Sequence, residues 1–200
     1  MLYGLPASTS INKSLYKKTV FEKFNLKTAE RDRFDMDVSR MTLVARVSPA
    51  TIPALAEGKE VKGFYVLQVV LKRREYDVQN ILMLSKLIPQ QLVFALQYEG
   101  QTQLCIFHTR LQQSAWLADA ETVIPLQGLS LDDVWLNIVA NLGGLDRGAA
   151  ESLEEQILHR EEHEKLLRQI EMLEKRCRAE KQTHKKYELH QQILKLKEKL

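Results

Sequence analysis

The chain has 200 residues, of which 44% are hydrophobic and 28% are charged, as in an ordinary soluble protein. Its formal net charge of +3 at pH 7 is too small to indicate nucleic-acid binding by itself. No stretch approaches 18 apolar residues, which argues against a membrane span, and the first residues do not have the pattern of a signal peptide.

The two cysteines, Cys105 and Cys177, lie far apart, and neither belongs to a CxxC pair, which argues against a zinc site. We expect both to be reduced thiols in a cytoplasmic protein. The eight glycines form no phosphate-binding loop pattern and no GxSxG nucleophile elbow. We therefore expect no cofactor, no metal ligand and no catalytic residue.

The first quarter of the chain predicts two helices followed by a strand. Residues 1–12 carry turn and cap residues and predict an irregular segment. Apolar residues recur at helical spacing within Lys13–Leu26, and Thr28 is a good cap for a second helix that ends near Met36. Apolar and polar residues then alternate within 38–47, which is typical of a strand with one buried face.

The middle of the chain contains its most apolar run. Residues 64–71 are β-branched and aromatic and predict a central strand that is covered on both faces. Asp77 is a plausible cap for a helix that Pro89 stops. Two further apolar runs, 92–96 and 104–107, flank Glu99-Gly100 and predict a β-hairpin.

The last element before the arm is a helix from Leu131 to Leu142. Trp116 lies in an extended segment before it, Ser130 and Asp133 resemble a capping box, and Gly143-Gly144 ends the helix. Strands and helices in this order predict an α/β (α+β) fold with a mixed sheet. We expect residues 1–148 to form this globular domain and 149–200 to form a separate helical coiled-coil arm.

The arm predicts an amphipathic helix, because residues 151–200 contain no Gly or Pro and apolar residues recur every three or four positions. A second apolar stripe, which begins at Leu189, is shifted in register. We therefore expect a break or a crossing partner within 181–187. The seam that we expect to be covered consists of Leu166, Ile170, Leu173, Cys177, Tyr187 and Leu194.

The charges of the arm are segregated along its length. Residues 151–174 carry eight acids and three bases, a net charge of −5, whereas 175–200 carry nine bases and three acids, a net charge of +6. The helix dipole acts only on the terminal turns and is worth about 0.3–1 kcal/mol per charge, so it does not explain this pattern. Two arrangements do: a hairpin that turns near Lys181–Lys185, or two arms from two chains paired antiparallel. A solvated single helix is the third alternative.

Two other features of the arm and the domain are candidate sites. His159 and His163 are four residues apart, as two metal-binding imidazoles on a helix would be, but no third ligand is evident and we interpret them as solvated residues. Basic clusters occur on the first predicted helix (Lys13 to Lys27), after the central strand and at 175–186. We interpret the first as a solvated helix face. The candidate contacts to nucleic acid or a partner are Lys72, Arg73, Arg74, Lys181, Lys185 and Lys186.

The order of the predicted elements also resembles the core of the PD-(D/E)xK nucleases. In that family an Asp and a Glu-x-Lys hold Mg²⁺ and position water. Lys72 would be the lysine and Asp35 or Asp37 the first acid, but Val70 stands where the glutamate would be. The sequence therefore favours a degenerate, non-catalytic relative over an active nuclease.

Five motifs resemble a bacterial family of uncharacterised proteins. They are GLPAST with INK, FYVLQVVLK, IPQQLVFAL, PLQGLSLDDVWLNIV and EKQTHKKYELHQQILKLKEKL, and together they span nearly the whole chain in order. The family's ending is usually similar to EKQFNRKVELN, so Thr183-His184 and His190 depart from it. The resemblance implies an association, by gene neighbourhood, with the DNA methyltransferases and helicases of restriction-modification-like defence systems, and it implies no established activity.

Two functions follow as expectations. The first is a non-catalytic accessory subunit of a DNA-modification or phage-defence system, which uses its helical arm to self-associate or to bind a methyltransferase or helicase subunit. The alternative is an Mg-dependent nuclease, or a DNA-binding remnant, of the PD-(D/E)xK type. DNA is a partner in the second case, and neither case involves a membrane.

Overall fold

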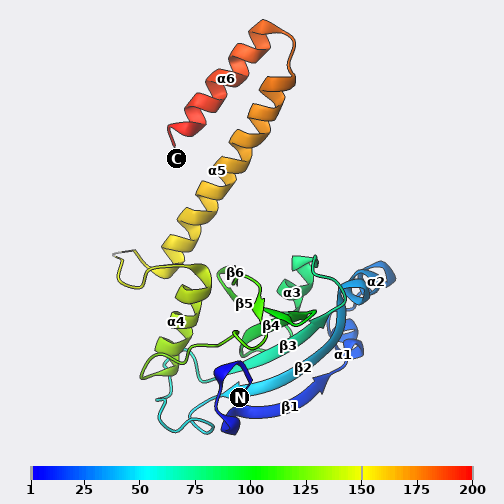
Figure 1. The fold of residues 1–200 in the computed structure, drawn as a ribbon, viewed down its shortest axis with the longest axis vertical. Coiled ribbons are helices and arrows are strands. Elements are labelled where there is room, and N and C mark those ends of the chain that lie inside the picture. The colour runs from blue at the N-terminus through cyan, green and yellow to red at the C-terminus, as the bar shows by residue number, and fades with distance from the viewer. Residues whose placement is uncertain (1, 150, 200) are drawn as a thin grey trace. The chain divides into compact units, whose positions relative to one another are not determined.

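The computed structural model, which describes residues 2–149 and 151–199, has all its described strands in the first three quarters of the chain (Figure 1). The chain divides into Met1–Arg147, called here the sheet domain, and Gly148–Leu200, called the helical hairpin. Within the described ranges, no helix is long and apolar enough to cross a membrane.

The sheet domain contains one mixed sheet of seven strands, which confirms the expected mixed α/β class. Six strands follow one another in the sheet in chain order, and β7 pairs with β5. All pairings are antiparallel except that of β3 with β4. The strands are β1 (Ser10–Leu15), β2 (Val38–Val47), β3 (Phe64–Leu71), β4 (Gln91–Tyr98), β5 (Gln101–His108), β6 (Arg110–Gln113) and β7 (Leu117–Ala118).

The parallel pair β3–β4 lies at the centre of the sheet. A parallel connection requires a crossover, and α3 (Val78–Leu84) supplies it. Burial on both faces explains why β3 is the most apolar run of the sequence: Phe64 and Val66 are buried on one face, and Leu67 and Val69 on the other.

Three helices cover the face of Leu67 and Val69. These are α1 (Lys17–Lys23), α2 (Thr28–Asp37) and α3. Each contributes buried residues to one apolar cluster with the central strands: Val20, Phe34, Ile81, Leu84, Leu67, Val69, Phe94 and Leu96. Burial of large side chains in such a cluster, at about 25 cal/mol per Å², is the main force that holds the sheet domain together.

The helix α4 (Leu131–Gly143) packs on the other face, where Trp135 and Phe64 have ring centroids 5.9 Å apart. Its ends are those that the sequence predicts. Ser130 accepts a hydrogen bond from the backbone N–H of Asp133, and Gly144 ends the helix with a φ of +58°.

The N-terminal segment differs from the prediction. Residues Ser10–Leu15 form the edge strand β1, and the following helix is only Lys17–Lys23, instead of an irregular lead-in and a helix from Lys13. The first five residues of β1 are exposed, so the segment has no alternation of apolar and polar residues to reveal a strand. A bulge between Ser10 and Lys13 also interrupts its pairing with β2.

Candidate functional site: the helical hairpin and its charged surfaces

The C-terminal unit consists of two helices that pack against each other, α5 (Leu153–Ala179) and α6 (Thr183–Lys197) (Figure 1). Ile170 and Leu173 from α5 are buried against Ile193 from α6, with Cys177, Leu189 and Leu196 packed around them. The helix is therefore broken between Ala179 and Thr183, at the start of the stretch in which the register shift predicts a break.

Polar contacts fix the ends of these helices. Ser152 and Glu155 form a capping box at the start of α5, and hydrogen bonds from the backbone N–H and hydroxyl of Ser152 keep the pKa of Glu155 below its usual value. At the turn, the carboxylate of Glu180 accepts a hydrogen bond from the backbone N–H of Gln182 (2.9 Å). This bond and the nearby charge of Lys185 lower the pKa of Glu180.

The apolar seam between the helices differs from the expected one on the α6 side. Ile170, Leu173 and Cys177 lie in it as expected, and Leu166 is half-buried. Tyr187 and Leu194, however, are 64% and 42% exposed. The reason is the register shift: the stripe of Leu189, Ile193 and Leu196 faces α5, which leaves Tyr187 and Leu194 outside the buried part of the seam.

Charge divides the helical hairpin into three segments. Residues 151–164, called here the acidic stem, have six acids and one base, a net charge of −5. Residues 165–174 have two acids and two bases and are neutral. Residues 175–186, called the basic tip, have six bases and one acid, a net charge of +5. The last fourteen residues add only +1.

Folding back does not bring the acidic stem beside a basic helix. The 15 residues of α6 span about 22 Å, whereas the 27 residues of α5 span about 40 Å. Near the end of α6, Lys197 pairs with Glu174 at 2.8 Å, so α6 lies along the neutral segment and the tip. The expectation that a hairpin would lay the −5 half beside the +6 half is therefore wrong.

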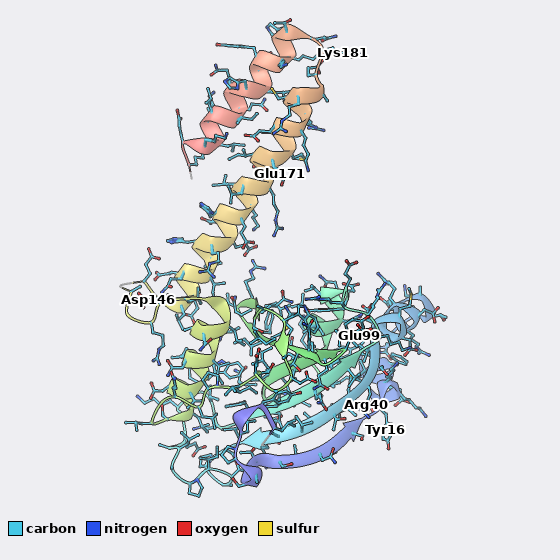
Figure 2. The ribbon with its side chains drawn as sticks, viewed as in Figure 1. Tyr16, Arg40, Glu99, Asp146, Glu171 and Lys181 are labelled. Atoms are coloured by element: carbon cyan, nitrogen blue, oxygen red, sulfur yellow. The ribbon has the colours of Figure 1, made fainter. Side chains whose placement is uncertain are left out.

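Most bases of the tip have no carboxylate partner. Lys175 pairs with Glu171 at 2.9 Å, and Arg178 approaches Glu174 at 3.6 Å. In the described parts of the chain, no ion pair within 4.0 Å involves the other four: Arg176, Lys181, Lys185 and Lys186. Figure 2 shows Lys181 at the turn between the two helices. The three predicted contact residues Lys181, Lys185 and Lys186 are thus all exposed at the tip, where Lys185 borders one groove between the helices and Lys186 borders another.

The hairpin also has a groove between its helices. It has a volume of about 200 Å³, and α6 contributes Ile193 and Leu194 to its lining. From α5 come Glu174, Cys177 and Arg178. The exposed side of Leu194 therefore borders a surface that is partly apolar and partly charged.

The other predicted basic cluster is dispersed by the fold. Arg73 donates to the carboxylate of Asp37, and the guanidinium of Arg74 lies 5.6 Å from the ring centre of Trp116. Lys72 is exposed, and its backbone N–H donates to the carbonyl oxygen of Asp37 (2.8 Å). The three side chains therefore do not form a single phosphate-binding surface.

Asp37 is the candidate acid that the fold brings next to Lys72. One carboxylate oxygen accepts a hydrogen bond from Arg73 Nε (2.6 Å), and the other accepts from the backbone N–H of Asp77 and from Asn80 Nδ2, both at 2.8 Å. The side chain is 1% exposed. Donors thus occupy both oxygens, and a metal ion would have to displace them. The other candidate, Asp35, pairs with Lys17 at 2.6 Å.

The histidines of α5 lie on an exposed part of the helix. His159 Nδ1 lies 3.3 Å from the carboxylate of Glu151, and both side chains are more than half exposed. Among the residues that the structure describes, no group of three or more His, Cys, Asp or Glu side chains is arranged to hold a metal ion.

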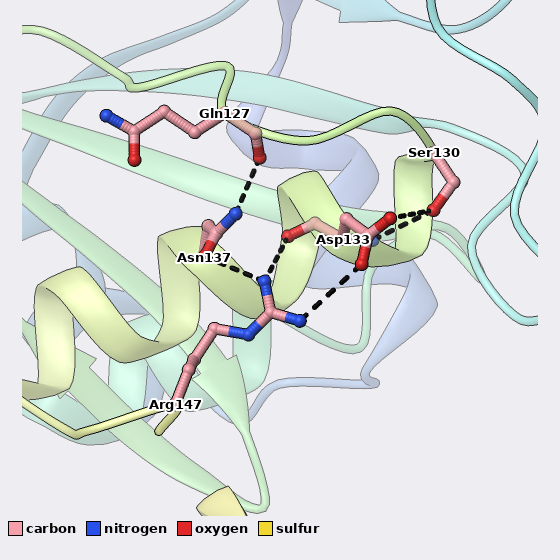
Figure 3. A network of polar contacts seen from close by, with 5 residues as sticks. All are labelled: Gln127, Ser130, Asp133, Asn137 and Arg147. Atoms are coloured by element: carbon pink, nitrogen blue, oxygen red, sulfur yellow. Dashed lines mark hydrogen bonds and ion pairs between the residues drawn. The ribbon is translucent and has the colours of Figure 1, made fainter.

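Two polar networks around α4 were not found from the sequence. In the first, Arg147 donates to Asn137 Oδ1 (2.8 Å) and approaches Asp133, while Asn137 donates to the carbonyl oxygen of Gln127 (Figure 3). In the second, the carboxylate of Asp132 accepts hydrogen bonds from the backbone N–H groups of residues 59–61, the shortest being 2.6 Å. Both tie α4 to loops of the sheet domain.

Cys105 illustrates how the sheet domain uses a reactive residue type for packing. Its side chain is fully buried in the core, and burial raises the pKa of the thiol to about 12. The thiolate is the nucleophilic form, so a thiol with this pKa is inert at neutral pH.

A protein-family model, described as domain of unknown function DUF4391, matches residues 3–200. No curated protein and no solved structure matches the chain. The match covers the sheet domain and the helical hairpin together, so the family includes both units. Its description carries no activity, and the surfaces described above are the basis for inferring a function.

Proposed function

The chain belongs to the DUF4391 family, and we propose that it is a non-catalytic interaction subunit that binds a partner through its helical hairpin. The observation that carries the proposal is the basic tip. Four of its six bases lack an ion pair in the described residues, and all four are exposed. Unpaired bases concentrated at one end of a helical hairpin are typical of a surface that meets an anionic partner surface.

The sheet domain supports the same proposal. Asp37, Arg73 and Cys105 are three side chains of types that catalytic sites use, and each is held in a structural contact. The proposed role of the sheet domain is therefore to carry the hairpin and to add further contact surface. The sequence resemblance favours a DNA methyltransferase or helicase subunit of a restriction-modification-like system as the partner, in the cytoplasm.

Co-purification tests this proposal. The full chain would be tagged and expressed with the methyltransferase and helicase subunits of a restriction-modification-like system from the same organism. We expect them to be retained by the wild type and lost from the triple variant Lys181→Glu, Lys185→Glu, Lys186→Glu. The matched control reverses three exposed lysines of the sheet domain, Lys13, Lys18 and Lys86. Equal retention by both variants, or none by the wild type, would contradict the proposal.

The second candidate function is a DNA-binding remnant or an Mg-dependent nuclease of the PD-(D/E)xK type. The order α2, β2, β3, α3, β4 with a parallel β3–β4 pair favours it, as does the proximity of Lys72 to Asp37. The hydrogen bonds that occupy Asp37, and Val70 at the position of the second acid, favour the remnant over the enzyme.

Incubation with DNA and Mg²⁺ or Mn²⁺ tests this candidate. A nuclease would cleave DNA, and cleavage would be lost in Lys72→Ala. A remnant would retain DNA in a salt-dependent manner, and Lys72→Ala would weaken retention more than Lys86→Ala, which removes an exposed lysine elsewhere in the sheet domain. If the protein neither cleaves DNA nor retains it in a salt-dependent manner, both the nuclease and the DNA-binding remnant are eliminated.

A further inference from the structure

The acidic stem and the basic tip are equal and opposite in net charge, and the ion pairs of the helical hairpin neutralise each only in part. In the stem, Glu161 and Glu164 pair with Lys165 and Arg168 of the neutral segment. In the tip, Lys175 and Arg178 pair with Glu171 and Glu174. The net charges are −5 and +5. Their centres lie roughly 30 Å apart along α5, at 1.5 Å per residue. Charges this far apart are screened from each other, because the Debye length is about 8 Å at physiological salt. The short α6 covers the neutral segment between them.

We propose that a second copy of this chain binds the helical hairpin antiparallel, so that the acidic stem of each copy lies against the basic tip of the other. This inference rests on the proposed function, because it names a partner for the same surface. An antiparallel pair has a two-fold axis, so every contact is made twice. In this one arrangement, each of the two acidic stems lies against a basic tip of opposite charge.

The position of the axis follows from the spacing of the two segments. Half-way between the stem and the α5 part of the tip lies residue 168, in the neutral segment. Leu167 is next to this point and is 46% exposed. In the proposed dimer, Leu167 of one copy meets the corresponding segment of the other. This position requires no charge complementarity, and an exposed leucine suits it.

The groove lined by Ile193 and Leu194 lies on the same side of the hairpin as Leu167. Leu167 precedes the groove residue Glu174 by seven positions, which is two helical turns, so the two share one side of α5. Leu194, 42% exposed, lines the groove from α6. A second copy that covers this side would bury both leucines, at about 25 cal/mol per Å² of apolar surface. Charge would then set the direction and register of the pair.

A nucleic acid accounts for fewer of these features. Its phosphates would match the basic tip, but they would repel the acidic stem on the same helix and would leave Leu167 and Leu194 uncovered. A second copy accounts for the tip, the stem and both leucines together. The observations therefore favour self-association, and nucleic-acid binding becomes an alternative outcome of the test.

Charge reversal in two separate chains provides the test. The tip variant is Lys181→Glu, Lys185→Glu, Lys186→Glu, and the stem variant is Glu154→Lys, Glu162→Lys, Glu164→Lys. Each changes the charge of its segment by six, so the tip becomes −1 and the stem +1. Analytical ultracentrifugation of the full chains measures association. We expect a wild-type dimer, and each variant alone should dissociate at least tenfold more readily.

The mixture of the two variants is the decisive sample. In a mixed pair, the −5 stem of the tip variant meets the +5 tip of the stem variant, and the two reversed segments also have opposite charges. We therefore expect mixing to restore the dimer, which a misfolded variant could not do. A monomeric wild type, or a mixture that stays monomeric, would overturn the inference.

Failure of this inference can be distinguished from failure of the proposed function. If the wild type is monomeric but the tip variant still loses its co-purified protein partner, the self-association is wrong and the interaction role stands. If instead the tip variant loses only salt-dependent binding to DNA, with no change in oligomeric state, the tip is a polyanion-binding surface and the second copy is excluded.

Discussion

The carboxylate of Asp37 joins three parts of the sheet domain, because it accepts hydrogen bonds from Arg73, Asp77 and Asn80 at the junction of α2 and β2. Asn at this position would keep the shape but lose the charge and turn an N–H group towards a donor. We expect Asp37→Asn to lower the free energy of unfolding by about 2–4 kcal/mol. Urea denaturation followed by tryptophan fluorescence measures this.

The nearby Asp35 is the control for this substitution. It also forms an ion pair, with Lys17, but its side chain is 45% exposed. We expect Asp35→Asn to cost less than about 1 kcal/mol, as exposed pairs usually do. Equal losses for the two substitutions would mean that burial and the additional donors do not distinguish Asp37.

Asp132 gives the sheet domain a defined dependence on pH. Backbone N–H groups of Val61, Lys59 and Glu60 donate to its carboxylate and lower its pKa. A lowered folded-state pKa means that the stabilising contribution is fully present above the unfolded value, about 4, and is lost as the pH falls through the lowered value. We expect Asp132→Asn to destabilise the protein more at neutral pH than below pH 3, by urea denaturation at both pH values.

A chemically similar neighbour provides the comparison for Asp132. Asp133 accepts hydrogen bonds from Ser130 and Arg147, which also lower its pKa, so Asp133→Asn should show the same sign of pH dependence. Lys59→Ala removes a side chain from the loop but keeps the backbone donor, and its effect should not depend on pH. A constant effect of Asp132→Asn at both pH values would show that the carboxylate charge is not what holds the loop.

These residue-scale contacts were beyond sequence analysis for a physical reason. Asp132 binds a loop 71 residues earlier in the chain, and Asp37 binds residues 36 to 43 positions later. Nothing in the local sequence distinguishes these acids from solvated ones. Conversely, the caps of α4 could be predicted, because Ser130 and Asp133 act on the first turn of their own helix.

At the scale of elements, the seam of the helical hairpin depends on Ile193, which is 5% exposed and contacts Ile170 and Leu173. We expect Ile193→Ala to cost about 2–3 kcal/mol, because it deletes buried methyl groups and leaves a cavity. The effect should appear as faster hydrogen exchange of the α6 amides, since a helix of 15 residues is marginal without packing.

Leu194→Ala is the matched control, because Leu194 is the next residue of the same helix and is 42% exposed. Truncation of Leu194 should change the free energy of opening of α6, measured by hydrogen exchange of the monomer, by less than about 0.5 kcal/mol. If Leu194→Ala loosened α6 as much as Ile193→Ala, the register of the seam described here would be incorrect.

Predictability at this scale follows burial. The central strand β3, the β4–β5 hairpin and α4 have strong apolar patterns, and the sequence predicts all three. The turn Glu99-Gly100 was also predictable, since both residues have positive φ and Gly favours it. The edge strand β1 was not predictable, because its exposed residues have no alternation of apolar and polar positions. Trp116, which the sequence places in an extended segment, lies between β6 and β7 and belongs to neither strand.

For the whole molecule, the sequence indicates segregated charge but not how far α6 would reach. The break near Lys181 follows from the shifted stripes. Because α6 is short, it does not reach the acidic stem, which therefore has no basic helix beside it. A count of charges in the two halves of residues 151–200 could not show this. The two complementary segments are therefore the basis for the proposed pairing of two copies.

The two units also allow a prediction about cooperativity. Both tryptophans, Trp116 and Trp135, lie in the sheet domain, so their fluorescence reports on that unit alone, whereas far-ultraviolet circular dichroism also reports on the hairpin helices. Among the described residues, three are buried in the seam: Ile170, Leu173 and Ile193. We therefore expect the helical signal to begin to fall at lower urea than the fluorescence signal.

Variants in each unit separate the two transitions. Ile193→Ala should move the early helical transition to lower urea and leave the fluorescence midpoint unchanged, whereas Asp37→Asn should move the fluorescence midpoint and leave the early transition in place. This follows because substitutions without shared partners have independent effects. Coincident transitions in the wild type and in both variants would show that the sheet domain and the helical hairpin unfold as one cooperative unit, and the division into two units would then not hold energetically.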